Sequence, residues 1–153
     1  MIHVDDNMIA DIRRFNRRYT NTLGVLNSHV LDSGYSFAEA RVVVEIGMME
    51  PCIANTLVSS LNIDRSYMSR IINRLVKLQI LSRQPSKDDQ RVSLLRLTAK
   101  GQQLYNELND KSDEQIIRLF QALPEQELIQ LHASMREIEH KLDQLERMEH
   151  DTI

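Results

Sequence analysis

Residues 57–75 read LVSSLNIDRSYMSRIINRL, and this stretch decides the fold. Apolar residues at three- and four-residue spacing predict a short helix over residues 53–61. A tight connection at Asn62-Ile63 follows, and Asp64 is a favourable N-cap for a second helix that begins at Arg65. The predicted buried faces are formed by Ala54, Leu57, Val58 and Leu61 in the first helix and by Met68, Ile71, Ile72, Leu75 and Leu78 in the second. The stretch therefore predicts a helix-turn-helix.

The face of the second helix that this pattern leaves exposed is basic and rich in hydrogen-bond donors. A helix that reads DNA presents short polar side chains and Arg at its N-terminal end, which enters the major groove first. The helix dipole also favours phosphate at that end. The side chains that we expect to contact bases or phosphates are Arg65, Ser66, Tyr67, Ser69, Arg70, Asn73 and Arg74.

A change of hydrophobic period follows Leu78, and it predicts two strands over residues 80–84 and 92–97. The Pro-Ser-Lys-Asp-Asp-Gln-Arg loop between them is too long and too charged for a minimal hairpin turn, as in a protruding wing. Near its tip, Asp89 could hold Arg91 extended, and an extended Arg suits a narrow minor groove. The wing residues that we expect at DNA are Lys87, Asp89 and Arg91.

The charge of the chain is divided unevenly along its length, although the formal net charge is only −3. Residues 64–100 contain nine Lys or Arg against three acidic residues, a net charge of +6. Residues 1–63 carry −2, and residues 101–153 carry −7. A localised positive patch on an acidic body attracts phosphate while limiting nonspecific adhesion. The charge pattern thus favours nucleic acid as the partner.

The remainder of the chain is predicted to be helical, because only four Gly and three Pro interrupt it. The expected helices run from about Asp5 to Leu31, from the Ser36 N-cap with a Glu39 capping box to about Met49, from the Thr98 cap to about Leu123, and from about Glu125 to Glu149. The first carries an apolar stripe of Ile12, Phe15, Tyr19, Leu23, Leu26 and Val30. The last carries a heptad seam of Leu128, Leu131, Met135, Ile138, Leu142 and Leu145. Stripes of this size usually mark a partner surface, so we expect a homodimer.

The fold class predicted from these patterns is mainly α with a small β-wing, in a single domain over residues 1–153. A winged helix-turn-helix lobe is expected over residues 35–100. Residues 1–34 and 101–153 are expected to form an N- and C-terminal helical dimerisation region. A two-fold dimer would place two recognition helices about 34 Å apart, or a multiple of it, to match a pseudo-palindromic operator.

The order of these motifs resembles the multiple antibiotic resistance regulator (MarR) family. The resemblance rests on residues 57–75, then on Ile80-Leu81-Ser82-Arg83, on Asp89-x-Arg91 and on Leu97-Thr98-x-x-Gly101. It implies a homodimeric transcriptional regulator, usually a repressor that a small anionic or phenolic effector releases from double-stranded DNA. The sequence does not identify the residues that would bind such an effector. Gln79 departs from the family pattern, which usually has Gly before the first wing strand.

Other function classes find less support in the sequence. There is no Gly-rich phosphate loop and no nucleophile beside an oriented base, so we expect no enzyme, no catalytic residues, no cofactor and no metal. The lone Cys52 follows Pro51 at the start of a helix, where the dipole could lower its pKa, and this leaves a redox-sensing regulator open. A winged-helix module that binds another protein is a further alternative. Without a signal peptide or an apolar span, the expected location is the cytoplasm, away from the membrane.

Overall fold

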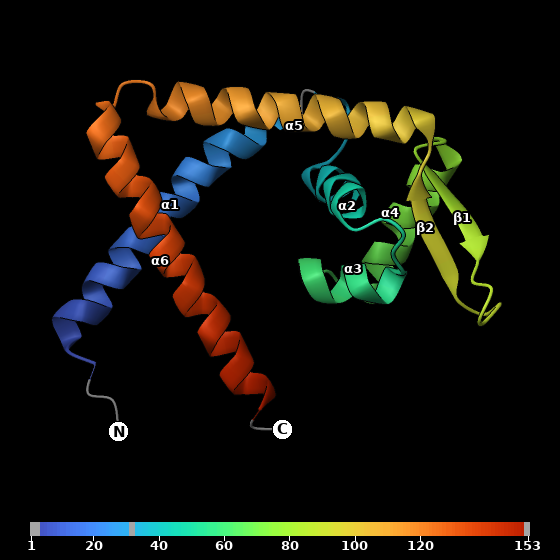
Figure 1. Cartoon of the computed structure of the whole chain (residues 1–153), viewed down its shortest axis with the longest axis horizontal. Coiled ribbons are helices and arrows are strands. Elements are labelled where there is room, and N and C mark those ends of the chain that lie inside the picture. Colours follow the sequence, from blue (N-terminus) through green and yellow to red (C-terminus); the bar gives the residue numbers. More distant parts are fainter. Residues whose placement is uncertain (1–3, 31–32, 152–153) are drawn as a thin grey trace. The chain divides into compact units, whose positions relative to one another are not determined.

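The computed structural model describes residues 4–30 and 33–151, and of residues 23–30 it describes the backbone alone. The chain divides into two compact units, residues 1–113 and residues 114–153. Its elements are labelled in Figure 1. The predicted class, mainly helical with a two-stranded wing, is confirmed.

Three short helices form the centre of the first unit. They are α2 (Phe37–Met48), α3 (Ala54–Leu61) and α4 (Arg65–Lys77). The helix ends follow the sequence: Ser36 and Glu39 form the predicted capping box, and the Asp64 carboxylate accepts a hydrogen bond from the Tyr67 amide at 2.9 Å. Between α3 and α4, Asn62 adopts a left-handed conformation with φ of 50°, which Asn tolerates better than most residues. The predicted helix-turn-helix is therefore present.

A two-stranded antiparallel sheet follows α4. Strand β1 (Leu81–Pro85) pairs with β2 (Ser93–Leu97), and Leu81 lies opposite Leu97. Each strand begins one residue later than the sequence pattern predicted. The reason is that the backbone amides of Ile80 and Val92 donate hydrogen bonds within the adjoining turns. Cys52 adds an isolated bridge to Leu95, with hydrogen bonds of 2.7 and 3.2 Å. In Figure 1 the hairpin extends past α4, with its loop at the end away from α5.

The core of the first unit is built from apolar side chains of α2, α3, α4, both strands and the start of α5 (Ala99–Phe120). The predicted α4 residues Met68, Ile71, Ile72 and Leu75 are all at most 3% exposed. In α3 the prediction is wrong for Ala54, which is exposed, and Val58 is only half-buried. The first turn of α3 follows the extended residue Ile53 without a side-chain cap, and Ala54 lies there at the surface.

The junctions around α5 depend on close packing. Thr98 accepts a hydrogen bond from the Gly101 amide at 3.0 Å, as the predicted cap requires. A Cβ atom on Gly101 would lie 2.1 Å from the Ile80 carbonyl oxygen, so only Gly allows this approach. Gln79, at the position where the family pattern has Gly, has a positive φ of 63°, a conformation that is strained for a residue with a side chain.

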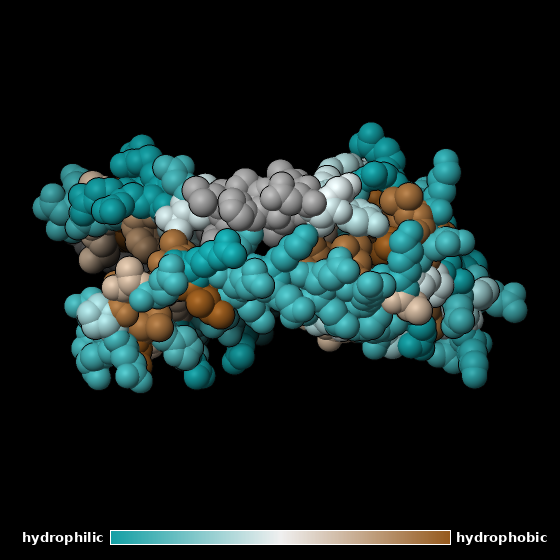
Figure 2. Space-filling model, turned by 90° about the horizontal axis from the view of Figure 1, so that it is seen from above, coloured by the Kyte–Doolittle hydropathy of each residue, from teal (hydrophilic) through white to brown (hydrophobic). Residues whose placement is uncertain are grey.

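The remaining helices are long and largely uncovered. Helix α1 (Asp6–Val30) belongs to the first unit, and its predicted stripe residues Ile12, Phe15 and Tyr19 are 40–51% exposed. The side chains of Leu23, Leu26 and Val30 lie outside the described residues. Helix α5 ends at Phe120, three residues before the predicted limit, and α6 (Glu125–His150) has no buried residue. Brown apolar residues accordingly reach the surface in Figure 2.

Candidate nucleic-acid interface

The N-terminal half of α4 presents the side chains that the sequence singled out. The side chains of Arg65, Ser66, Tyr67, Ser69 and Arg70 are all exposed. They are held outward because Met68, Ile71 and Leu75 anchor the opposite face in the core. The result is a firmly packed helix with a polar, basic N-terminal end at the surface.

Two of these exposed side chains contact each other. The Arg70 guanidinium carbon lies 5.5 Å from the centroid of the Tyr67 ring, three residues earlier on the same helix. Such a cation–π contact contributes about 0.5–1 kcal/mol at an exposed site. It restricts the directions in which Arg70 can point, and so it orders part of the exposed face before any partner arrives.

The wing loop is closed by its own hydrogen bonds. The Ser86 amide donates to the Val92 carbonyl at 2.8 Å, and the Asp89 carboxylate accepts from the Arg91 amide at 3.0 Å. Arg91 Nε also lies 3.6 Å from Asp89 Oδ1, while the Arg91 side chain is 94% exposed. This is the arrangement expected from the sequence, an Arg at the tip with an acid at its base. Lys87 is exposed on the same loop.

Residues of α4 and of the wing line a shared hollow. This cavity of about 370 Å³ is lined by Ser69 and by the guanidinium-bearing residues Arg65, Arg83 and Arg91, above apolar residues such as Ile72 and Leu95. The structure thus brings together predicted residues that are 26 positions apart in sequence, Arg65 and Arg91. Arg83, which was not among the residues expected at DNA, also lines this hollow.

Asn73 and Arg74, the last two residues of α4 that were expected at DNA, form hydrogen bonds within the lobe. Arg83 of β1 donates a hydrogen bond to the Asn73 side-chain oxygen. Arg74 donates to Glu39 of α2, whose side chain is only 9% exposed. Sequence spacing could not reveal either contact, because the partners come from other elements, 10 and 35 residues away.

Cys52 differs from the sequence expectation. The residue is 6% exposed, and its backbone pairs with Leu95 beside the wing. Burial raises the pKa of the Cys52 thiol, and the nearby carboxylates of Glu45 and Glu50 raise it further. The expected lowering of the pKa by a helix dipole is therefore wrong, because desolvation and negative charge disfavour the thiolate.

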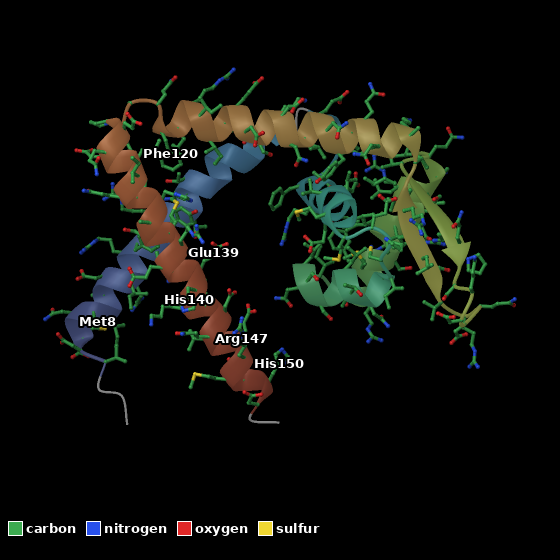
Figure 3. The ribbon with its side chains drawn as sticks, viewed as in Figure 1. Met8, Phe120, Glu139, His140, Arg147 and His150 are labelled. Carbon is green, nitrogen blue, oxygen red and sulfur yellow. The ribbon has the colours of Figure 1, made fainter. Side chains whose placement is uncertain are left out.

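Helix α6 carries three histidines, His132, His140 and His150. Figure 3 labels His140 and His150 with Glu139 and Arg147 along this helix, and His140 lies 3.2 Å from the Gln144 amide nitrogen. Within residues 4–30 and 33–151, no three His, Cys, Asp or Glu side chains are gathered so that they could hold a metal ion. In the same part of the chain, no helix is both long and apolar enough to span a bilayer.

Together, the fold and this surface define a winged helix-turn-helix protein. The model of the MarR family matches residues 33–92, which include α2, α3, α4 and β1, and this match agrees with the resemblance found in the sequence. The chain is 23% identical over 111 residues to the HTH-type transcriptional regulator BilQ of Clostridium symbiosum, and the match covers 72% of this chain and 77% of the relative.

Solved structures show the same fold. One is a MarR-family regulator from Listeria monocytogenes complexed with 26mer DNA, with a TM-score of 0.68, 21% identity and coverage of 93% of this chain and 90% of the other. Another is wild-type MarR from E. coli, with a TM-score of 0.73, 18% identity and coverage of 90% and 98%. The TM-scores establish a common fold. Because the identities are below 25%, the argument about function rests on the residues described above.

Proposed function

We propose that this chain is a sequence-specific regulator of transcription that binds double-stranded DNA. The observation that carries the proposal is the shared hollow, where Arg65 of α4 and Arg91 of the wing face one space from two elements. Positive charge from two adjacent protrusions matches a duplex, whose backbone is a dense line of negative charge. The complex of the Listeria regulator with DNA supports this role for the fold.

In this proposal, α4 enters the major groove by its N-terminal end. Arg65, Ser66, Tyr67, Ser69 and Arg70 make contacts to base edges and neighbouring phosphates, since Arg and Ser are common donors to bases. The wing follows the adjacent minor groove. Arg91, held extended above Asp89, enters that groove, and Lys87 lies at the backbone. Asn73 and Arg74 complete the set expected from the sequence, and both form hydrogen bonds within the lobe.

We propose that the active form is a homodimer. Four residues of the α6 seam, Leu128, Ile138, Leu142 and Leu145, are 38–58% exposed, and the other two, Leu131 and Met135, are half-buried. A heptad seam is the pattern by which one helix packs against another. A second copy of the chain would cover this surface and present two recognition helices to a pseudo-palindromic operator.

Repression, release by a small-molecule effector and a cytoplasmic setting extend the proposal, as the family resemblance implies. An effector that moves the protein from 99% DNA-binding form to 1% must favour the other form by about 5.5 kcal/mol. A module that binds only other proteins fits the surface less well. Such a module has no need of guanidinium groups from α4, β1 and the wing loop around one hollow.

Selection of binding sites from random duplex DNA tests the proposal most directly. We expect an enriched pseudo-palindrome whose half-sites are separated by about one turn of DNA or a multiple of it. On that site, Arg70→Ala and Arg91→Ala should each weaken binding by at least about tenfold. Arg118→Ala, at an exposed position of α5, serves as the charge-matched control and should bind normally. Failure to enrich any sequence, with both arginine variants behaving like wild type, would contradict the proposal.

A further inference from the structure

Glu39 is the one charged side chain that is buried among the residues the structure describes, at 7% exposure. Both of its carboxylate oxygens are occupied. Oε2 accepts a hydrogen bond from the Ser36 amide at 3.3 Å and completes the capping box of α2, while Oε1 accepts one from Arg74 Nη1. A capping box needs only the first of these bonds. The second joins two helices, and the capping role does not explain it.

The partner of this carboxylate lies in the last turn of the recognition helix. The Arg74 side chain is 51% exposed, so it extends from the surface toward the buried carboxylate. At the neighbouring position, Asn73 is bound by Arg83 of β1. Two successive residues of α4 are thus held by side chains from α2 and from the wing. Arg70, by contrast, stacks on Tyr67 of its own helix.

We propose that Glu39 is a positioning residue for DNA binding. By pairing with Arg74, it fixes the direction of α4 and keeps Arg74 away from phosphate. The residues of α4 that contact DNA therefore end at Arg70. The inference rests on the proposed function, and it gives Arg74 a different role from the one expected from the sequence. A buried carboxylate that loses its cationic partner strongly destabilises a fold, so the pair is held together in the folded lobe.

Two residues of α4 with the same side chain allow a matched test. Arg74→Gln removes the cation from Glu39, and Arg70→Gln makes the same substitution one turn earlier at a residue that is not bonded to Glu39. Glu39→Gln retains a capping side chain, since Gln also serves at this position of a capping box. The full-length variants and the double variant Glu39→Gln/Arg74→Gln are compared by melting temperature and by affinity for the selected duplex across a salt series.

The proposal predicts opposite signatures for the two arginines. Arg74→Gln should lower the melting temperature by on the order of 10 °C and leave the slope of log affinity against log salt at the wild-type value. Arg70→Gln should weaken DNA binding at least about tenfold with a nearly unchanged melting temperature. The double variant should melt above Arg74→Gln, because it leaves no charge buried. Glu39→Gln alone frees Arg74 and should steepen the salt slope by up to about 0.9.

Other results would overturn the inference. If Arg74→Gln reduced the salt slope by about 0.9 without changing the melting temperature, Arg74 would be a phosphate contact. If the two single substitutions had additive effects on the melting temperature, Glu39 would act only as a helix cap. If the wild-type chain bound no selected duplex, the proposed function would fall together with the positioning role. The salt slope and the melting temperatures separate the first two results from the third.

Discussion

The winged lobe and the C-terminal helix use apolar residues at the same spacing with opposite results. In α4, Met68 and Leu75 are fully buried within one chain. In α6, Leu142 and Leu145 repeat at the same three- to four-residue intervals, yet they are 54% and 58% exposed. The lobe has a core of its own, whereas α6 has no buried residue. Helical spacing therefore predicts which face of a helix is apolar, but it does not predict what covers that face.

The largest effect is expected when the α6 seam is made polar. The double substitution Ile138→Glu/Leu142→Glu places four additional charges on the two facing seams of a dimer, where each would be buried without a partner. We expect a monomer in sedimentation, and a loss of operator affinity of at least about a hundredfold because one half-site contact is lost.

The control variant introduces the same number of negative charges at positions away from the seam. Gln130→Glu/Gln144→Glu lies on the exposed side of the same helix and should remain dimeric with normal affinity. A monomeric wild-type protein, or a dimer that survives Ile138→Glu/Leu142→Glu, would mean that the seam is not the dimer surface.

The same substitution, Leu to Ala, should have different effects in the lobe and in α6. Leu75→Ala removes a fully buried side chain and should destabilise the lobe by about 2–5 kcal/mol. Leu145→Ala changes a side chain that only a partner would cover. Denaturant unfolding at several protein concentrations separates the two: the effect of Leu145→Ala should depend on concentration, because it acts through dimer dissociation. Equal, concentration-independent losses would contradict the contrast between the regions.

A third prediction concerns the strained junction between α4 and β1. Gln79 has a φ of 63°, and Gly adopts this conformation without the penalty that a Cβ atom brings. Gln79→Gly should therefore stabilise the lobe by up to about 1 kcal/mol. Gln84→Gly, in β1, is the matched control and should destabilise it by about 0.5–1 kcal/mol. Thermal unfolding measures both, and a loss of stability in Gln79→Gly would show that the Gln side chain contributes more than the strain removes.

The smallest expected effect is at Cys52. Because burial raises the pKa of its thiol, the thiolate fraction at neutral pH is below that of an ordinary Cys, and alkylation of the folded protein should be slow. The raised pKa stabilises the fold only while the thiol stays protonated, so this contribution is lost as the pH rises through the alkaline range. Peroxide treatment at neutral pH should leave DNA binding unchanged. Iodoacetamide labelling, with the denatured chain as the control, measures the reactivity, and rapid labelling of the folded protein would restore the redox alternative.

Most of the architecture could be predicted because local chemistry fixes it. The capping box at Ser36, the N-cap at Asp64 and the cap at Thr98 mark helix starts through contacts within three residues. Pro124 and the polar wing loop separate the later elements in the same local way. Helix ends are not marked in this way: α5 stops at Phe120 rather than at Leu123, since apolar residues alone do not signal where a helix ends.

Sequence alone is sufficient to predict the order of the elements, the polar side of α4 and the wing Arg above its acid, because each depends on neighbours along the chain. Tertiary structure alone decided that Arg65, Arg83 and Arg91 line one hollow, that Arg74 pairs with Glu39, and that Cys52 is buried. These three facts depend on which elements pack together. Packing joins residues tens of positions apart, and the charge or burial that it imposes on a side chain is not encoded in the residues beside it.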